Sequence, residues 1–222
     1  MQQQSPAPLA YGKIANAYDA FLTFSGFRRG VVNFLDRIEL PLPPAPRILD
    51  AGCGTGLISR YLIRRLPDAH IMAADIDRSM LAEMERLVTK EGLPKERFLI
   101  AEGDLSSPER IRVFSTDEQV AVSENSFDGI FVSGALEYVP LQETIRRLVR
   151  LLRPGGLFFN LGMRRSPAGA ILSMMYGVKP YRIAEMRDAC ESAGLADIQV
   201  LPLRAEDFPA NLSRVAITAQ KR

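Results

Sequence analysis

The sequence predicts an α/β fold in which a parallel sheet is covered by helices on both faces. Two observations lead to this prediction. After residue 46, short apolar runs of strand length alternate with segments whose apolar residues recur at helical spacing. In addition, the stretch RILDAGCGTG at 47–56 joins a strand to a helix through a glycine-rich turn, as in open α/β sheets that bind nucleotides.

The composition is that of an ordinary globular protein. The chain has 222 residues, of which 47% are hydrophobic and 24% charged, and its formal net charge is +2. This length suits one domain with a substantial core, and the near-neutral charge gives no argument for nucleic acid or an anionic surface as a partner. We interpret the arginine pairs as solvated helix faces and turns; they are Arg28–Arg29, Arg64–Arg65, Arg146–Arg147 and Arg164–Arg165.

Cysteine use and hydropathy bear on the compartment. The two distant cysteines, Cys53 and Cys190, indicate a reduced protein rather than a disulfide framework. The opening MQQQSPAPLA lacks the features of a secretory signal, and no apolar run reaches the roughly 20 residues of a membrane span. We therefore expect a cytoplasmic protein with no membrane span. The sequence does not predict its oligomeric state.

The first forty residues are predicted to form an N-terminal arm and a helical lid. Residues 1–10 suit a flexible arm, and from Tyr11 to Leu40 the apolar spacing predicts two helices separated by Ser25–Gly26. The proline-rich PLPPAP at 41–46 excludes both helix and central strand. Residues 41–222 are then expected to form the ligand-binding domain, within a single globular unit overall.

Strands and helices alternate through the rest of the chain. The first predicted strand ends at Asp50, and the others are His70–Ala74, Phe98–Ala101, Phe127–Val132, Leu157–Leu161, Ile198–Leu201 and Val215–Ala219. The predicted helices are Leu57–Leu66, Ser79–Lys90 with Asp77 as N-cap, Leu141–Leu152 stopped by the RPGG at 153–156, and Arg182–Ala193 ended by Gly194.

The spacing of the glycines limits the class of nucleotide. A dinucleotide fingerprint needs glycine at 57, where this chain has Leu57, and a phosphate-binding P-loop needs a lysine that is absent here. What remains is D-x-G-x-G-x-G, with Gly52, Gly54 and Gly56 following Asp50. Glycine permits positive φ and lets a ligand lie against the backbone. A glycine turn without a ligand is the alternative.

This turn resembles motif I of the class I S-adenosylmethionine (SAM) methyltransferases. AADIDRSML at 73–81, SFDGIFVSGALEYV at 126–139 and RLLRPGGLFF at 150–159 resemble further segments of that family. The resemblance extends from about Tyr11 to the end and is strongest to the small-molecule "type 11" and ubiquinone-biosynthesis-like branch. It implies a Rossmann-like three-layer sandwich whose seven-stranded, mostly parallel sheet has an antiparallel last strand. It also implies SAM as cofactor.

Two segments are expected to bind the ribose and adenine of SAM. Asp75 follows the second strand, where a carboxylate can accept hydrogen bonds from both ribose hydroxyls; a helix N-cap is the alternative. Ile76 and Met80 would enclose the adenine, unless they serve only helix packing. In the family, the acid matching Asp104 accepts from the adenine amino group, with its neighbours Gly103 and Leu105 alongside. An Asx-turn is the other possibility for Asp104.

The segment after Asp104 departs from the family pattern. The link from Asp104 to Phe127 is longer than usual. We expect it to hold an extra helix or hairpin beside the adenine pocket.

The methionine end of SAM is expected near the glycine turn. Asp50 would receive its ammonium group through water or orient the turn, and Ser133 and Gly134 would lie beneath the methyl group. The complete set of predicted cofactor-binding residues is Asp50, Ala51, Gly52, Cys53, Gly54, Gly56, Asp75, Ile76, Met80, Gly103, Asp104, Leu105, Ser133, Gly134, Tyr11 and Tyr18.

Candidate catalytic residues are few. Glu137 and Tyr138 stand where the family often has two histidines, and with Tyr18 they are the groups that could polarise a hydroxyl or amine. The only histidine, His70, begins the second strand at the end opposite the site. One histidine and two separated cysteines predict no metal site. This suits methyl transfer, in which the enzyme mainly aligns the reactants and excludes water.

Two segments could close the substrate side. The first helix, with Tyr11, Tyr18 and Asp19, resembles the family's Y-x-x-x-A-x-x-Y-D entry helix. The methionine-rich stretch Met163–Tyr181 would form either a pocket wall or ordinary core. The predicted function is methyl transfer to O, N or C of a small, partly apolar molecule, whose acidic group, if it has one, would meet an arginine. The alternatives are a non-catalytic SAM-binding subunit or regulator, and a nicotinamide-dependent reductase.

Overall fold

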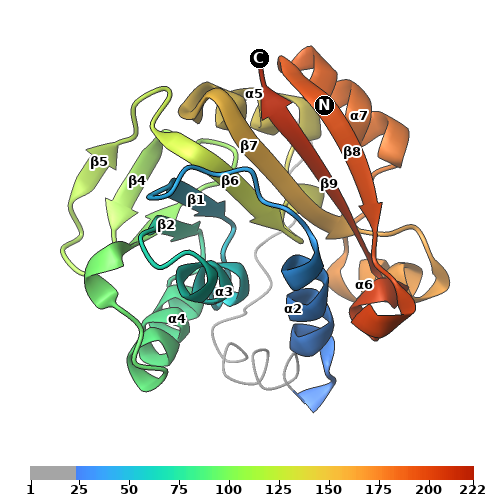
Figure 1. Ribbon diagram of the computed structural model, residues 1–222, viewed down its shortest axis with the longest axis horizontal. Coiled ribbons are helices and arrows are strands. Elements are labelled where there is room, and N and C mark those ends of the chain that lie inside the picture. Colours follow the sequence, from blue (N-terminus) through green and yellow to red (C-terminus); the bar gives the residue numbers. More distant parts are fainter. Residues whose placement is uncertain (1–23) are drawn as a thin grey trace.

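The computed structural model describes residues 24–222. One sheet crosses the molecule, with strand order β5-β4-β3-β2-β1-β6-β7-β9-β8, and helices cover both of its faces (Figure 1). This is the predicted α/β sandwich. The sheet's two edges lie far apart, with the hairpin β4/β5 at the left of the figure and β8 at the right.

The elements follow the sequence pattern closely. The strands are β1 (Arg47–Ala51), β2 (His70–Asp75), β3 (Phe98–Gly103), β4 (Arg110–Val113), β5 (Gln119–Ala121), β6 (Phe127–Ser133), β7 (Leu152–Met163), β8 (Leu195–Pro202) and β9 (Arg214–Lys221). The α-helices are α2 (Phe27–Arg37), α3 (Leu57–Arg65), α4 (Arg78–Lys90), α5 (Leu141–Leu151), α6 (Pro167–Tyr176) and α7 (Ile183–Ser192). Short 3-10 turns include η3 (Leu136–Tyr138), η4 (Ala205–Asp207) and η5 (Ala210–Leu212).

The expectation of seven strands is wrong for the described chain, because the sheet has nine. The two additional strands are the hairpin β4/β5, which fills the long link after Asp104 and pairs antiparallel with the free edge of β3. The five strands β1, β2, β3, β6 and β7 run parallel, and β9 inserts antiparallel between β7 and β8. The antiparallel last strand is therefore confirmed.

The strand predicted at Leu157–Leu161 begins earlier, at Leu152. Leu152 pairs with Phe127 of β6, and regular pairing resumes at Leu157 after a register shift. The RPGG segment ends α5 as expected, but it does so as an irregularity inside a long strand rather than as a separate turn. The register shift accommodates Gly155, whose φ is +73°.

The alternation of side chains along β1 and β2 separates two packed layers. Ile48 and Ile71 face the core formed with α2 and α3, whereas Leu49 and Ala51 face the core formed with α5 and α7. Helix α4 covers Ala73 on the first side with its buried face. Both faces of the parallel strands are thus buried, which explains their nearly continuous hydrophobic composition.

In the first two arginine pairs, Arg28, Arg64 and Arg65 connect helices, contrary to the sequence interpretation, whereas Arg29 is exposed. Glu91, at the end of α4, is paired with Arg28, Arg60 and Arg64. Arg65 donates to the carbonyl oxygens of residues 35 and 38, at the end of α2. These charges therefore tie α2, α3 and α4 together on one face of the sheet.

Candidate functional site

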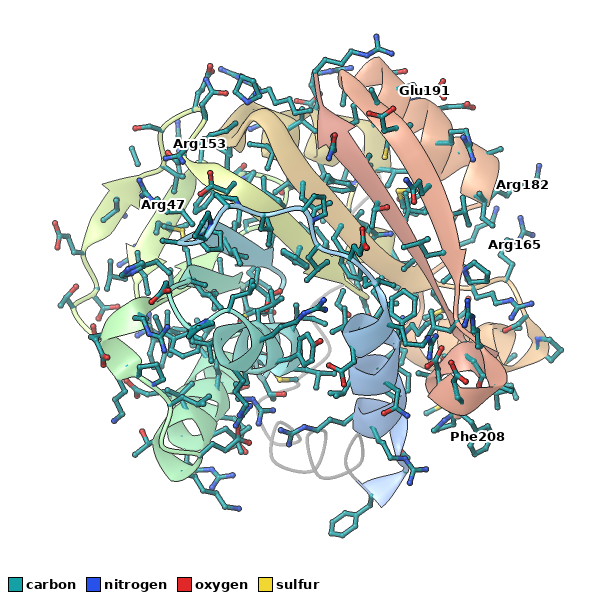
Figure 2. All side chains as sticks on the ribbon, viewed as in Figure 1. Arg47, Arg153, Arg165, Arg182, Glu191 and Phe208 are labelled. Carbon is teal, nitrogen blue, oxygen red and sulfur yellow. The ribbon has the colours of Figure 1, made fainter. Side chains whose placement is uncertain are left out.

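A pocket of about 740 Å³ opens at the edge of the sheet where β1, β2, β3 and β6 end. This is the edge at which open α/β sheets bind ligands, because the chain reversals leave a crevice there. At the opposite ends of these strands, the backbone N–H of Arg47 and the guanidinium of Arg153 both donate to the carboxylate of Asp128. The two arginines lie near one another in Figure 2. His70, which is exposed, also starts its strand at that far edge.

The glycine turn is shaped by close contacts as well as by positive φ. Gly52 has φ +71°, and a Cβ added there would lie 2.5 Å from the Cβ of Ala135. Gly56, with φ +77°, is the N-cap of α3, and a Cβ on it would meet Met84 at 2.8 Å. The turn therefore requires glycine at both positions, and the backbone between them borders the pocket.

Asp75 organises this turn from the end of β2. Its Oδ2 accepts from the Gly54 N–H at 2.8 Å and its Oδ1 from the Asp77 N–H at 2.9 Å. Burial raises the pKa of Asp75, and these two backbone hydrogen bonds oppose that effect. Each oxygen keeps a further lone pair, so the carboxylate can accept hydrogen bonds from a ligand while it holds the turn. The helix N-cap is Asp77, as predicted, which accepts from Ser79 N–H.

Asp50 lies at the floor of the pocket and is 1% exposed. Its Oδ2 accepts from both the N–H and the hydroxyl of Ser59, at 3.0 and 2.6 Å. Its Oδ1 is buried and has no hydrogen-bond partner in the described part of the chain. Burial is the main reason that the pKa of Asp50 rises to about 6. One oxygen thus orients helix α3, and the other remains available to a donor in the pocket.

The residues expected at the adenine end gather on one side of the pocket. Ile76, Met80 and Asp104 all line it. Ile76 is 58% exposed, whereas Met80 is buried in α4. Asp104 Oδ1 accepts from the N–H and hydroxyl of Ser106, which is the Asx-turn that the sequence left as an alternative. The β4/β5 hairpin backs this region, since a Cβ on Gly103 would lie 3.2 Å from Ile111.

The other side of the pocket is built on the ends of β6 and β7. Ser133, Gly134, Glu137 and Tyr138 line it. Oε1 of Glu137 accepts from the backbone N–H of Met163, and Oε2 is buried with no hydrogen-bond partner from residue 24 onward. The pocket thus contains a carboxylate that is anchored through one oxygen and has acceptor capacity left on the other.

The methionine-rich segment forms a helix that the sequence analysis did not predict. Ser166 caps α6 by accepting from the Gly169 N–H at 3.0 Å, and Gly177 ends it with φ +66°. Met174 and Met175 are 85% and 66% exposed and line the pocket. This placement favours the pocket wall over the core for this stretch.

Most of the predicted cofactor residues meet at this pocket. Those that line it are Asp50, Gly52, Cys53, Gly54, Asp75, Ile76, Met80, Gly103, Asp104, Leu105, Ser133 and Gly134. Ala51 instead packs into the core beneath α5, and Gly56 packs against Met84. Tyr11 and Tyr18 lie outside the described residues.

Several lining residues escaped the sequence analysis. Thr55 lies in the glycine turn and Leu57 follows it as the first residue of α3, so the motif could have indicated both. Phe27 and Arg214 come from the first residues of α2 and β9. No local pattern marks these two, because only the packing of α2 on η4 and η5 and the pairing of β9 with β7 bring them to the pocket.

The site fits SAM on its own geometry. The glycine backbone borders the cavity, a Cβ on Gly52 would collide with Ala135 in its wall, and Oδ1 of Asp50 is a buried acceptor without a partner among the described residues. Within residues 24–222, no group of three His, Cys, Asp or Glu side chains is arranged to hold a metal ion. The helices described in that range are too short or too polar to cross a membrane.

Comparison with known proteins gives a consistent result. Residues 48–156 match the family model described as "Methyltransferase domain". Demethylmenaquinone methyltransferase from Thermus thermophilus is 28% identical over 202 residues, which cover 90% of this chain and 84% of that protein. Ubiquinone biosynthesis O-methyltransferase from Xanthomonas oryzae pv. oryzae is 32% identical over 130 residues, covering 58% of this chain and 48% of that protein.

The length covered differs among these relatives. Apart from the Thermus protein, the chain spans about half the length of the curated relatives it matches, from 39% to 57%. Among solved structures, phosphoethanolamine N-methyltransferase 2 of Haemonchus contortus in complex with SAM has a TM-score of 0.71 at 17% identity. That match covers 95% of this chain and 57% of the other, and it shows a shared fold.

Proposed function

Because this chain belongs to the class I SAM-dependent methyltransferases, we propose that it transfers the methyl group of SAM to an oxygen, nitrogen or carbon atom of a small, partly apolar molecule. The observation that carries the proposal is the single pocket that borders both the glycine turn and the exposed methionines of α6. The part beside the glycine turn, called the cofactor half, suits a nucleoside with an amino-acid tail. The part beside α6, called the acceptor half, suits an apolar methyl acceptor.

The cofactor half is assigned by its hydrogen-bonding groups. Asp75 would accept from the ribose hydroxyls, and Asp104 with Ile76 would enclose the adenine. The buried, unpartnered Oδ1 of Asp50 supports its role as acceptor for the ammonium of the methionine end. When bound, SAM supplies a methyl group on a positively charged sulfur that is a good leaving group.

The acceptor half needs alignment more than acid–base chemistry. Glu137 is the proposed proton acceptor for a hydroxyl or amine, because the Met163 N–H fixes one of its oxygens and leaves the other free of partners. Once an acceptor is found by screening, Glu137→Gln should lower kcat by about 100-fold or more while SAM affinity stays unchanged. An unaltered kcat would remove Glu137 from the reaction. Tyr138 also lines the pocket and is the second candidate for this role.

Two further expectations belong to this proposal. Phe27 lines the pocket from α2, which supports a role for residues 1–40 in closing it over the domain formed by 41–222. Both cysteines are free and buried, which supports a reduced, cytoplasmic location.

Calorimetric titration with SAM tests the proposal. The wild-type protein should bind SAM, and Asp75→Asn should weaken binding by at least about tenfold, because ribose hydroxyls would lose an acceptor in a closed site. Asp77→Asn is the matched control: it lies two residues away, also lines the pocket, and asparagine caps a helix as well as aspartate does. Absence of SAM binding at millimolar concentration would refute the proposed function.

A further inference from the structure

Arg214 is the one basic side chain among the described residues that line the pocket. It is the first residue of β9 and lies opposite Met163 of β7 in the antiparallel ladder. The pocket also contains five carboxylates, contributed by Asp50, Asp75, Asp77, Asp104 and Glu137. Arg214 would be expected to form an ion pair with one of these carboxylates.

No described carboxylate pairs with this guanidinium. Nε and Nη1 of Arg214 are buried and have no hydrogen-bond partner within residues 24–222. Its Cζ lies 5.4 Å from the centroid of the Phe27 ring, and a Cβ added to Gly134 would lie 3.2 Å from its Nη2. The guanidinium is therefore held between an aromatic ring and a glycine backbone. A buried charge without a counterion is destabilising unless an anion binds beside it.

The carboxylate of Glu137 is not the counterion of Arg214. Glu137 uses Oε1 to accept from the Met163 N–H, and its carboxylate forms no ion pair with Arg214. Position in the sheet also separates the strand of Arg214 from the strands of Asp50 and Asp75, although Gly134 lies beside its guanidinium. In the order β2-β1-β6-β7-β9, the strand of Arg214 is the third from the strand of Asp50 and the fourth from the strand of Asp75. At the usual spacing of about 4.8 Å per strand, the backbones of these strands are roughly 14 and 19 Å from that of β9.

We propose that Arg214 binds a carboxylate or phosphate group of the methyl acceptor, so that the acceptor is a partly apolar anion. The inference rests on the proposed function and narrows its substrate class. A guanidinium pairs with either oxyanion through two parallel N–H donors, and the Phe27 ring, 5.4 Å from Cζ, restricts the space that the guanidinium can occupy. The exposed Met174 and Met175 are available for the apolar part of the same molecule.

Binding of model anions to the protein saturated with S-adenosylhomocysteine tests this assignment. The probes are 4-phenylbutyrate, its uncharged amide, and phenyl phosphate, titrated by calorimetry. The wild-type protein should bind at least one of the two anions about tenfold more tightly than the amide, and Arg214→Gln should reduce that preference to within about twofold. The anion that binds more tightly, 4-phenylbutyrate or phenyl phosphate, shows whether Arg214 prefers a carboxylate or a phosphate. Binding of neither anion in preference to the amide would overturn the proposal.

Arg165→Gln is the matched control for loss of a positive charge. Arg165 is exposed, points away from the sheet in Figure 2, and does not line the pocket. This variant should keep the wild-type preference for the anion. If Arg214→Gln fails to show a cooperative thermal transition, Arg214→Lys replaces it; lysine keeps the charge without the fork, and the preference should fall but not vanish.

Two results separate this proposal from its premise. If Arg214→Gln weakens S-adenosylhomocysteine binding about tenfold and leaves 4-phenylbutyrate binding unchanged, the guanidinium serves the cofactor's own carboxylate and the proposal fails. If the wild-type protein does not bind S-adenosylhomocysteine at all, the proposed function fails. The anion preference of the ligand-free protein, compared with Arg214→Gln, then still decides the role of Arg214.

Discussion

At Asp75, both carboxylate oxygens already bind the protein's own backbone. One accepts from Gly54 in the glycine turn and the other from Asp77 at the start of α4. The position of an acid after the second strand predicts a ribose acceptor, and the contacts show that the same residue also holds the turn in shape. A substitution at Asp75 would therefore disturb the glycine turn even in the absence of a ligand.

The buried carboxylate of Asp50 should make stability fall as pH rises. Its pKa is raised from 3.8 to about 6, mainly by burial, so the folded state binds a proton more tightly than the unfolded state does. Ionisation between these two values then favours unfolding. The contribution of Asp50 should decrease by about 2 kcal/mol between pH 4 and pH 7.

Asp50→Asn isolates this effect from the other titrating groups. Asparagine can still accept from Ser59 but carries no charge. The free energy of unfolding, measured with urea for both proteins at pH 4, 5, 6 and 7, should show the variant gaining on the wild type as pH increases. A difference that stays constant over this range would mean that Asp50 does not titrate above its ordinary pKa.

At the scale of single elements, helix α2 is bound tightly to the turns that precede β9. Arg37 forms a two-point ion pair with Asp207 of η4, at 2.6 and 2.7 Å, and Asn33 donates to the carbonyl oxygen of Glu206. The ion pair lowers the pKa of Asp207 and raises that of Arg37. Because η4 and η5 lead into Arg214, the docking of α2 fixes both Phe27 and Arg214 at the pocket.

Gly30→Ala tests this docking. Alanine is favoured over glycine in a helix by about 1 kcal/mol, yet a Cβ on Gly30 would overlap the carbonyl oxygen of Asp207. We expect overpacking to outweigh propensity, with a net loss of about 1 to 3 kcal/mol in urea unfolding.

Arg29→Ala, on an exposed position of the same helix, is the control and should change stability by less than about 0.5 kcal/mol. A Gly30→Ala protein more stable than the wild type would show that η4 can move away from α2 at little cost.

The β4/β5 hairpin is the element that departs most from the family pattern. It pairs with β3, and Arg78 at the start of α4 bridges Glu102 of β3 and Asp117 of the hairpin turn. The long link after Asp104 thus extends the sheet and backs the adenine side of the pocket.

For the molecule as a whole, ligand binding should couple to global stability, because the pocket is lined from both halves of the sheet. At SAM concentrations 100-fold above Kd, mass action contributes about 2.7 kcal/mol, which raises Tm by roughly 5 to 10 °C for a chain of this size. Differential scanning fluorimetry measures the shift. Asp75→Asn should show a much smaller shift, and NADPH should give none; an equal shift with NADPH would contradict the cofactor assignment.

The sequence by itself determined the alternation of strands and helices, the glycine turn and the cofactor half of the site. These features are local: hydrophobic periodicity specifies each element, and positive φ restricts Gly52 and Gly56 to glycine. Because neighbouring parallel strands have their carboxyl ends on the same side of the sheet, Asp50, Asp75 and Asp104 meet at one pocket, and the strand pattern alone predicts this.

Only the tertiary structure decided the acceptor half. The hairpin pairs with the otherwise unpaired edge of β3. Arg65 is not solvated as predicted, because it donates to carbonyl oxygens at the end of α2. Phe27 and Arg214, which are 187 positions apart, meet at the pocket because β9 inserts beside β7 and α2 packs on the turns before it. Such contacts depend on side-chain packing between distant segments, and no periodicity within either segment records them.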